Sequence, residues 1–296
     1  LARFGRLNSQ RVNWENHWQE VADYMMPRKA NITKRRTRGD KRNELIFDSS
    51  PLQALELLAA SLHGMMTNPS TPWFTLKFKD AQMDQNDEAK LWLESVTADM
   101  YTAFNRSNFQ QEIFELYHDL ITFGTAAMYI EEDDEDLLKF STKHIAEIFI
   151  AEDDKGRIDT VYRKFTLSAR ALVQKFGNKV SQNIKVMSEK DPYQDVDILH
   201  CVYPRADFNP KLKDQENMPF ESVYLEMGSG DELSVSGFKE FPYVVPRYLK
   251  ASHEIYGRSP AMTALPDVKM LNEMSKTTIK AAQKQVDPPL LVPDDG

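Results

Sequence analysis

The residues best suited to chemistry are six consecutive acids, Glu131 to Asp136, in the stretch "EEDDED". Carboxylates can hold divalent ions that activate water, but a two-metal site needs acids that converge from separate elements on a dry pocket. Consecutive like charges repel one another and favour solvent. The run is therefore typical of a solvated loop, with a contact in an assembly as a second interpretation. If the run did hold metal ions, the protein could be a metal-dependent DNA-processing enzyme built on residues 131–136, and we keep this as an alternative function.

No other stretch offers a catalytic, cofactor or metal site. His200 and Cys201 are neighbours in a predicted strand, so their side chains point to opposite faces and do not share a zinc ion. The sequence contains no GxxxxGK[ST] phosphate loop, no GxGxxG fingerprint and no GxSxG elbow. These absences favour a protein that is not an enzyme and that needs neither cofactor nor metal.

Basic residues form a second candidate, the basic arm, which we define as residues 28–42. It holds eight basic residues and one acid, with a lone apolar residue, Ile32, in its interior. Such a segment has no hydrophobic face, so it is either a solvated loop or a contact for an acidic partner. The candidate contact residues are Lys34, Arg35, Arg36, Arg38, Lys41 and Arg42.

Four lysines near the end of the chain form a third candidate, the lysine ridge: Lys269, Lys276, Lys280 and Lys284. With Leu265 at 0° and 100° per residue, they fall between about 20° and 100° on a helix. Glu273 lies among them, within i+3 reach of Lys276. The arc between about −180° and −40° is mainly apolar, and it holds Val268, Leu271, Met274, Thr278, Ile279, Ala282 and Val286. On a single chain, such a ridge is usually a wet surface.

Helices and antiparallel strands must position these residues. Apolar periodicity predicts helices over 6–26, 51–63, 87–104, 109–122 and 168–177, and a short one near 181–189. Asp48, Ser49 or Ser50 can cap the helix that begins at Pro51. The final helix has Ser259 as its cap, and Pro266 is expected to kink or restart it.

Short β-rich runs predict the strands. They are residues 73–78, 125–132, 137–141, 146–153, 157–165, 197–203, 222–227, 232–238 and 242–250. "EDDKGR" predicts a hairpin with Gly156 at positive φ, and "GSGD" predicts a second one. Pro246 places the last strand at an edge or a bulge. The order of elements defines an α+β fold that ends in a long helix.

Composition sets outer limits. The 296 residues suffice for one large domain or two ordinary ones. The net charge of −8 argues against tight, nonspecific binding of nucleic acid by a monomer, so any basic site must be local. A single cysteine excludes a disulfide within the chain and favours a reducing compartment. No apolar run reaches the ~20 residues of a membrane span. The missing initiator Met and the abrupt end predict a fragment of a longer polypeptide.

Several stretches, in their order and spacing, carry a resemblance to a known family. They are "IFDSSPLQALELLAASLHGMMTNPSTPWFTL", "ITFGTAAMYIEED", "FIAEDDKGRIDTVYRKFTLSARALVQKFG", "HCVYPR", "SVSGFKEFPYVVPRYLKASHEIYGRSPAMTALPDVKMLN" and "DPPLLVPDDG". From about residue 12 onward the chain resembles the portal, or head-to-tail connector, proteins of short-tailed bacteriophages.

This resemblance implies a structural subunit of a ring, typically dodecameric, at one vertex of the capsid. Double-stranded DNA would pass through its channel during packaging and ejection. The packaging motor (terminase), the tail or adaptor and the capsid proteins would be partners. The resemblance implies a virion protein that assembles in the host cytoplasm. Residues 1–255 would form a wing, 256–287 the first stem helix and 288–296 the start of the clip, where the chain is cut. In a ring, the lysine ridge could face the channel.

Overall fold

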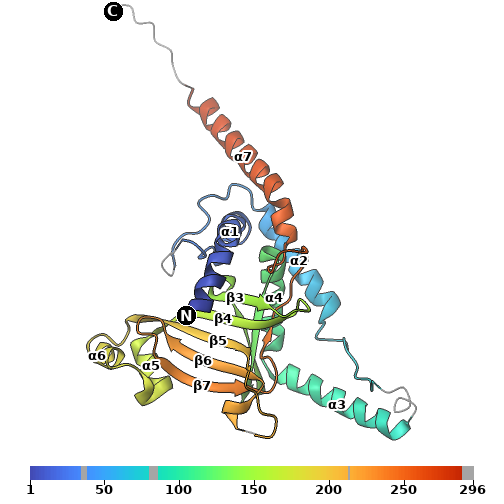
Figure 1. The fold of residues 1–296 in the computed structure, drawn as a ribbon. Helices are drawn as coiled ribbons and strands as arrows, with labels where there is room; N and C mark the ends of the chain where they lie inside the picture. Colours follow the sequence, from blue (N-terminus) through green and yellow to red (C-terminus); the bar gives the residue numbers. More distant parts are fainter. Residues whose placement is uncertain (35–38, 80–85, 213, 289–296) are drawn as a thin grey trace, which may run out of the picture.

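The computed structural model describes residues 1–34, 39–79, 86–212 and 214–288. The fold mixes helices with two antiparallel sheets, in agreement with the predicted α+β class (Figure 1). The helices are α1 (Ala2–Met25), α2 (Ser50–Met66), α3 (Asp87–Arg106), α4 (Phe109–Phe123), α5 (Ala169–Phe176), α6 (Gln182–Lys190) and α7 (Pro260–Val286). A short 3-10 helix, η1 (Pro27–Lys29), follows α1.

The larger sheet has five strands in the order β3-β4-β5-β6-β7, and each neighbouring pair is antiparallel. Its strands are β3 (Ile148–Glu152), β4 (Ile158–Ser168), β5 (Asp195–Pro204), β6 (Phe220–Glu226) and β7 (Glu232–Phe238). The smaller sheet has the order β2-β1-β8, with β1 (Ala127–Asp133), β2 (Leu137–Lys143) and β8 (Tyr243–Val244). Gly156 and Gly230 turn the two predicted hairpins with φ of 74° and 80°.

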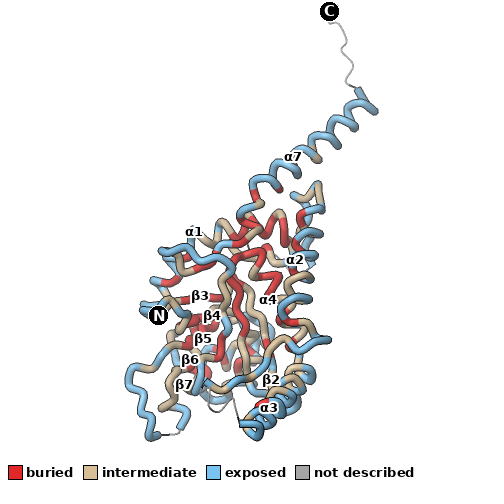
Figure 2. The backbone as a smooth tube through the Cα atoms, turned by 90° about the vertical axis from the view of Figure 1, so that its right-hand side faces the viewer, coloured by how far each residue is buried: buried red, intermediate tan, exposed pale blue. Residues whose placement is uncertain are grey.

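The main core lies where α1, α2, α4 and the first part of α7 meet the strands (Figure 2). Trp18 is its centre: the ring is fully buried, and its Nε1 donates to the carbonyl oxygen of Phe123 at 3.0 Å. Tyr256 packs edge-on against the same ring. Burying an indole removes a large apolar surface from water, and the hydrogen bond satisfies its one polar atom. The core therefore fixes the base of α7 against α1 and α4.

Two smaller cores cover the faces of the five-stranded sheet. The start of α1 packs Leu7 on a face that includes Leu199 and Cys201, while α5 and α6 pack Leu172 and Ile184 on a face that includes Ile198. Because successive residues of a strand point to opposite faces, β5 serves both cores. His200 is buried on the other side from Cys201, where its Nε2 lies 3.0 Å from Ser222 Oγ. The prediction that this pair belongs to an ordinary strand is confirmed.

The predicted strand at 73–78 is wrong. The Tyr101 hydroxyl accepts from the backbone nitrogens of Trp73 and Phe74 at 2.6 and 2.7 Å and donates to the carbonyl of Phe74. One side chain of α3 thus takes the backbone bonds that a partner strand would take, and residues 72–78 run along α3 without pairing in either sheet. Two other predicted boundaries differ. α1 begins at Ala2 rather than at residue 6, and only two residues of the predicted 242–250 strand form β8.

The caps behave as the sequence predicts. Asp48 Oδ1 accepts from the backbone nitrogen of Ser50 at the start of α2, at 2.8 Å. Ser168 and Ser259 accept from the backbone at the starts of α5 and α7. α7 nevertheless continues through Pro266, so the expected restart of the helix there does not occur.

Candidate nucleic-acid interface

α7 is anchored at one end and projects from the body at the other (Figures 1 and 2). Ser259 Oγ accepts from the backbone nitrogen of Met262 at 3.0 Å and donates to the carbonyl of Thr122 at 2.8 Å. Ala261, Met262, Leu265 and Val268 are buried in the main core. After Asn272, every described residue up to 288 is half-buried or exposed. The first third of the helix thus positions a long solvent-facing remainder.

The lysine ridge divides into a paired half and an unpaired half. Lys269 donates to Glu20 of α1, and this hydrogen bond raises the pKa of Lys269. Lys276 Nζ lies 3.0 Å from Glu273 Oε2, as the helical spacing predicts, and 5.7 Å from the centre of the Phe47 ring. Lys280 and Lys284 are exposed and form no ion pair with any residue that the structure describes. The unpaired charge therefore lies on the projecting part of α7.

The apolar arc of α7 is also uncovered along this projecting part. Leu271, Met274, Ile279 and Val286 are 38%, 59%, 46% and 87% exposed. Within the single chain, this arc is buried only as far as Val268. A contiguous exposed apolar surface next to a polar face is typical of an interaction site.

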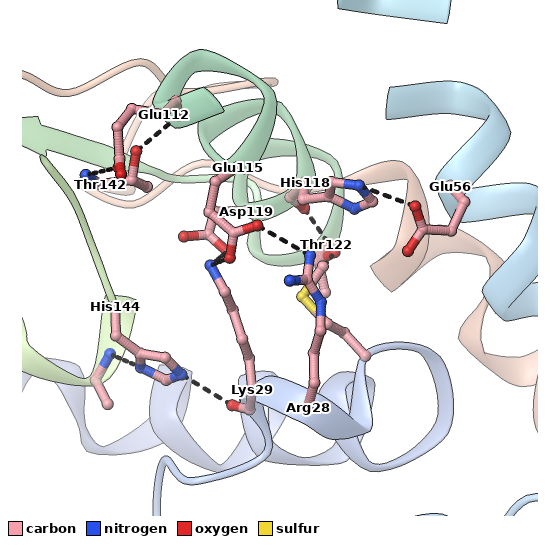
Figure 3. A network of polar contacts seen from close by, with 12 residues as sticks. Arg28, Lys29, Glu56, Glu112, Glu115, His118, Asp119, Thr122, Thr142 and His144 are labelled. Atoms are coloured by element: carbon pink, nitrogen blue, oxygen red, sulfur yellow. Dashed lines mark hydrogen bonds and ion pairs between the residues drawn. The ribbon is translucent and has the colours of Figure 1, made fainter. Parts of the chain in front are cut away.

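The root of the basic arm is held by a partly buried ion network between η1 and α4 (Figure 3). Lys29 Nζ lies 2.5 Å from Asp119 Oδ1 and 2.6 Å from Glu115 Oε1, and Arg28 Nη2 lies 3.0 Å from Glu115 Oε2. Burial raises the pKa of Asp119 to about 6, against the pull of the Lys29 ammonium. Burial also acts to raise the pKa of Glu115, but Lys29 and Arg28 hold it below its ordinary value. Two basic residues of the arm are therefore structural.

His118 and His144 lie beside this network. His118 is buried, and its Nε2 lies 3.2 Å from Glu56 Oε2 on α2. His144 Nε2 lies 3.0 Å from the carbonyl oxygen of Lys29. Burial lowers the pKa of both histidines, which keeps them neutral at pH 7.

Two buried amide side chains hold the backbone near the start of the arm and just after the arm. Gln19 of α1 accepts from the backbone nitrogens of Ile32 and Thr33 at 3.0 and 2.9 Å, and its Nε2 donates to the carbonyl of Ala30. Its position between the apolar residues of α1 gives no clear signal of this role in the sequence.

Asn272 of α7 holds the backbone just after the arm. Its Oδ1 accepts from the backbone nitrogens of Phe47 and Asp48 at 2.7 and 3.3 Å, and its Nδ2 donates to the carbonyl of Leu45 at 2.8 Å. Asn272 is not among the residues predicted from the sequence, although its position carries a signal, because an amide at about −20° borders the apolar arc of the helix. The arm is thus tied to α1 near its start, and the segment just after it, residues 45–48, is tied to the helix that carries the lysine ridge.

The candidate contact residues of the arm differ in their surroundings. Lys34 Nζ lies 3.1 Å from Asp23 Oδ2, and Arg42 donates to the carbonyl of Arg28. Lys41 is exposed. The other three candidates, Arg35, Arg36 and Arg38, lie outside the described residues.

The acidic run spans the turn of the β1–β2 hairpin. Glu132, Asp134, Glu135 and Asp136 are exposed. Within the described ranges, no group of three or more His, Cys, Asp or Glu side chains has a geometry that could hold a metal ion. The run therefore has the surroundings of a solvated turn. Among the helices described, none is both long and apolar enough to cross a bilayer.

Comparisons with known proteins identify the class of protein to which this fold belongs. The chain belongs to the bacteriophage head to tail connecting protein family, whose model matches residues 1–295. It is 34% identical over 298 residues to the "Probable portal protein" of Bordetella phage BPP-1 and 34% identical over 299 residues to the "Portal protein" of Salmonella phage epsilon15. Each alignment covers 99% of this chain and 54% of the relative, so the chain spans about half the length of these relatives. The resemblance inferred from the sequence is confirmed.

Proposed function

We propose that this chain is part of a structural subunit of a portal ring at a capsid vertex, where it lines the passage for double-stranded DNA. The observation that carries the proposal is the family match along the whole chain together with the exposed surface of α7. A helix that leaves 38–87% of four apolar side chains in water has more apolar surface than its own chain covers. Side-to-side contacts between copies would bury it, and a heterologous contact that closes forms a ring.

The domain assignment follows the same proposal. Residues 1–255 would be the wing, 256–287 the first stem helix and 288–296 the start of the clip. α7 supports the stem assignment, because it leaves the body at Asn272 and continues to Val286. A second stem helix and a crown would belong to the remaining length that the relatives have.

The lysine ridge supplies the chemistry that a DNA passage needs. In a ring, each exposed lysine of a subunit becomes a belt of ammonium groups. DNA that slides must meet weak contacts that ignore sequence and engage phosphates. The ammonium of lysine, on a flexible side chain, suits such contacts better than the planar, bidentate guanidinium of arginine. Lys280 and Lys284 are the leading candidates, since Lys269 and Lys276 have acidic neighbours.

The partners of the whole protein would be double-stranded DNA, the terminase packaging motor, tail or adaptor proteins and the capsid. The location would be the portal vertex of the virion, after assembly in the host cytoplasm. The exposed basic residue Lys41 and the acidic turn at 131–136 are surfaces that such partners could contact. No observation favours the alternative of a metal-dependent DNA-processing enzyme.

Electron microscopy of the full-length protein tests the proposal. Class averages viewed along the particle axis should contain a closed ring with an axial hole. Light scattering at high protein concentration should give a mass that is a multiple of the subunit mass. A monodisperse monomer in both measurements would refute the ring, and metal-dependent cleavage of DNA by the purified protein would favour the alternative enzyme.

A further inference from the structure

A second charged site lies far from α7, over one face of the five-stranded sheet. A cavity of about 450 Å³ opens there between β4, α5 and β6. Arg163, Lys175 and Tyr224 line it, together with Glu147 and apolar residues of β4. Arg163 Nε donates to Glu147 Oε2 at 2.8 Å, whereas its two terminal nitrogens form no hydrogen bond with any described residue. The guanidinium is therefore held in place with donors to spare.

The Arg163 charge acts on two lysines that form no ion pair with a described residue: Lys175, which lines the cavity, and Lys143 of β2, which is not among the lining residues. Lys175 Nζ lies 4.7 Å from the centre of the Tyr224 ring, and Lys143 Nζ lies 5.8 Å from the centre of the Tyr129 ring. Within the described part of the chain, neither ammonium has a carboxylate oxygen within the 4.0 Å of an ion pair. Both are held over aromatic rings on either side of the buried His200, which stacks on Tyr224 at 4.0 Å.

The acids nearby already have partners, and Glu147 is paired with Arg163 of the site itself. Glu147 accepts from Arg163, Glu112 accepts from the backbone nitrogen of Thr142 at 2.6 Å, and Glu131 Oε1 lies 3.7 Å from Lys139 Nζ. Burial, and after it the Arg163 charge, lower the pKa of Lys143 to about 8. Burial and then Arg163, Lys175 and Lys143 lower the pKa of His200 in the same way. Positive charge is thus concentrated here beyond what the local acids neutralise.

We infer that this cavity is an anion site that takes a small oxyanion, a phosphate or carboxylate group, on Arg163 and Lys175 with Lys143 at its edge. The guanidinium offers a planar pair of donors, which matches the oxygens of such a group. Arg163 and Lys143 are half-buried, so their attraction for an anion is stronger than at an open surface, whereas Lys175 is exposed. The site lies apart from the lysine ridge, and the inference does not depend on the proposed ring.

Binding of inorganic phosphate tests the inference directly. Calorimetric titration of the purified protein at pH 7, against sodium chloride of equal ionic strength, should give one saturable site. Lys175→Met and Lys143→Met should each weaken phosphate binding by at least tenfold. Lys164→Met is the matched control, because Lys164 is the next residue on β4, points to the other face and pairs with Asp197 at 3.3 Å. It should leave binding unchanged.

Three further outcomes complete the test. Acetate in place of phosphate distinguishes a carboxylate site from one that needs a phosphate group, and binding of either supports the inference. Raising the pH from 7 to 9 should weaken the binding of acetate, whose own charge is constant in this range, since Lys143 loses its proton with a pKa of about 8. If the parent and both Met variants bind phosphate equally, and the variants have native circular dichroism, the inference is overturned. Binding of phosphate that is no stronger than binding of chloride would overturn it as well.

Discussion

Gly124 and Gly257 face each other so closely that a Cβ on either would lie 2.3 Å from the carbonyl oxygen of the other. Gly124 ends α4 with φ of 75°, and Gly257 lies three residues before α7. Hydrogen bonds on both sides seal the contact: Tyr248 donates to the carbonyl of Gly124, and the backbone nitrogen of Gly257 donates to Thr125 Oγ1 at 2.8 Å. The two glycines thereby set how α7 leaves the body.

Gly124→Ala should therefore be severe. The substitution combines a left-handed backbone, which costs an L-residue roughly 1–2 kcal/mol, with a clash against backbone that cannot move aside. We expect a loss of unfolding free energy of more than about 2 kcal/mol, measured by urea denaturation. Gly230→Ala is the control, because it has φ of 80° but its nearest atom is a flexible Leu1 methyl at 3.4 Å. Equal losses in the two variants would show that the close approach is unimportant.

The turns, caps and strand alternation of this chain could be predicted because each depends on residues within a few positions. Gly156 and Ser259 behave as local rules require. The misses depend on residues far apart in the sequence. Tyr101 removes the strand at 73–78 from 27 positions away, and Asp119 captures Lys29 from 90 positions away.

Of the candidate site, helical spacing alone placed Lys276 beside Glu273. No local pattern could reveal that Glu20 engages Lys269 across 249 positions, or that the apolar arc stays uncovered. Such features follow from how helices pack in three dimensions. The likeness to a family conveys that packing, whereas periodicity does not.

Asn272 should control how firmly the backbone just after the basic arm is held. Asn272→Leu keeps the volume but leaves the backbone groups of Leu45, Phe47 and Asp48 without their partners, at a cost of about 1–3 kcal/mol. We expect faster trypsin cleavage after Lys41 and Arg42, followed by mass spectrometry. Thr277→Val, at an exposed position of the same helix, should cleave at the parent rate. Unchanged cleavage in Asn272→Leu would show that other contacts hold the segment.

The buried Asp119 gives the stability a defined dependence on pH. Its pKa is raised from 3.8 to about 6 in the folded state, so the folded chain binds this proton more tightly than the unfolded chain. The contribution of Asp119 to the unfolding free energy therefore rises as pH falls from 7 to 4, by up to ~3 kcal/mol. Histidines with lowered pKa act in the opposite direction below pH 6.5, so the parent alone does not isolate Asp119.

Comparison with Asp119→Asn removes that difficulty. The unfolding free energy of the parent minus that of the variant should grow in favour of the parent as pH falls from 7 to 4. A difference that stays constant across the range would mean that Asp119 does not carry the raised pKa.

The lysine ridge makes the sharpest functional prediction. Lys280→Ala with Lys284→Ala removes two exposed charges that have no ion pair among the described residues, so folding and assembly should be unaffected. In the full-length protein, DNA translocation or retention should change, and more so at low salt, because screening shortens the reach of the charges to roughly 10 Å at 0.1 M. Lys276→Ala with Lys280→Ala should act in the same direction but less strongly, since Glu273 already offsets Lys276. Lys269→Ala is the matched control, because that ammonium is engaged by Glu20. If the Lys280 and Lys284 double variant packages and retains DNA as the parent does at every salt concentration, the ridge is a solvated face and another surface meets the DNA.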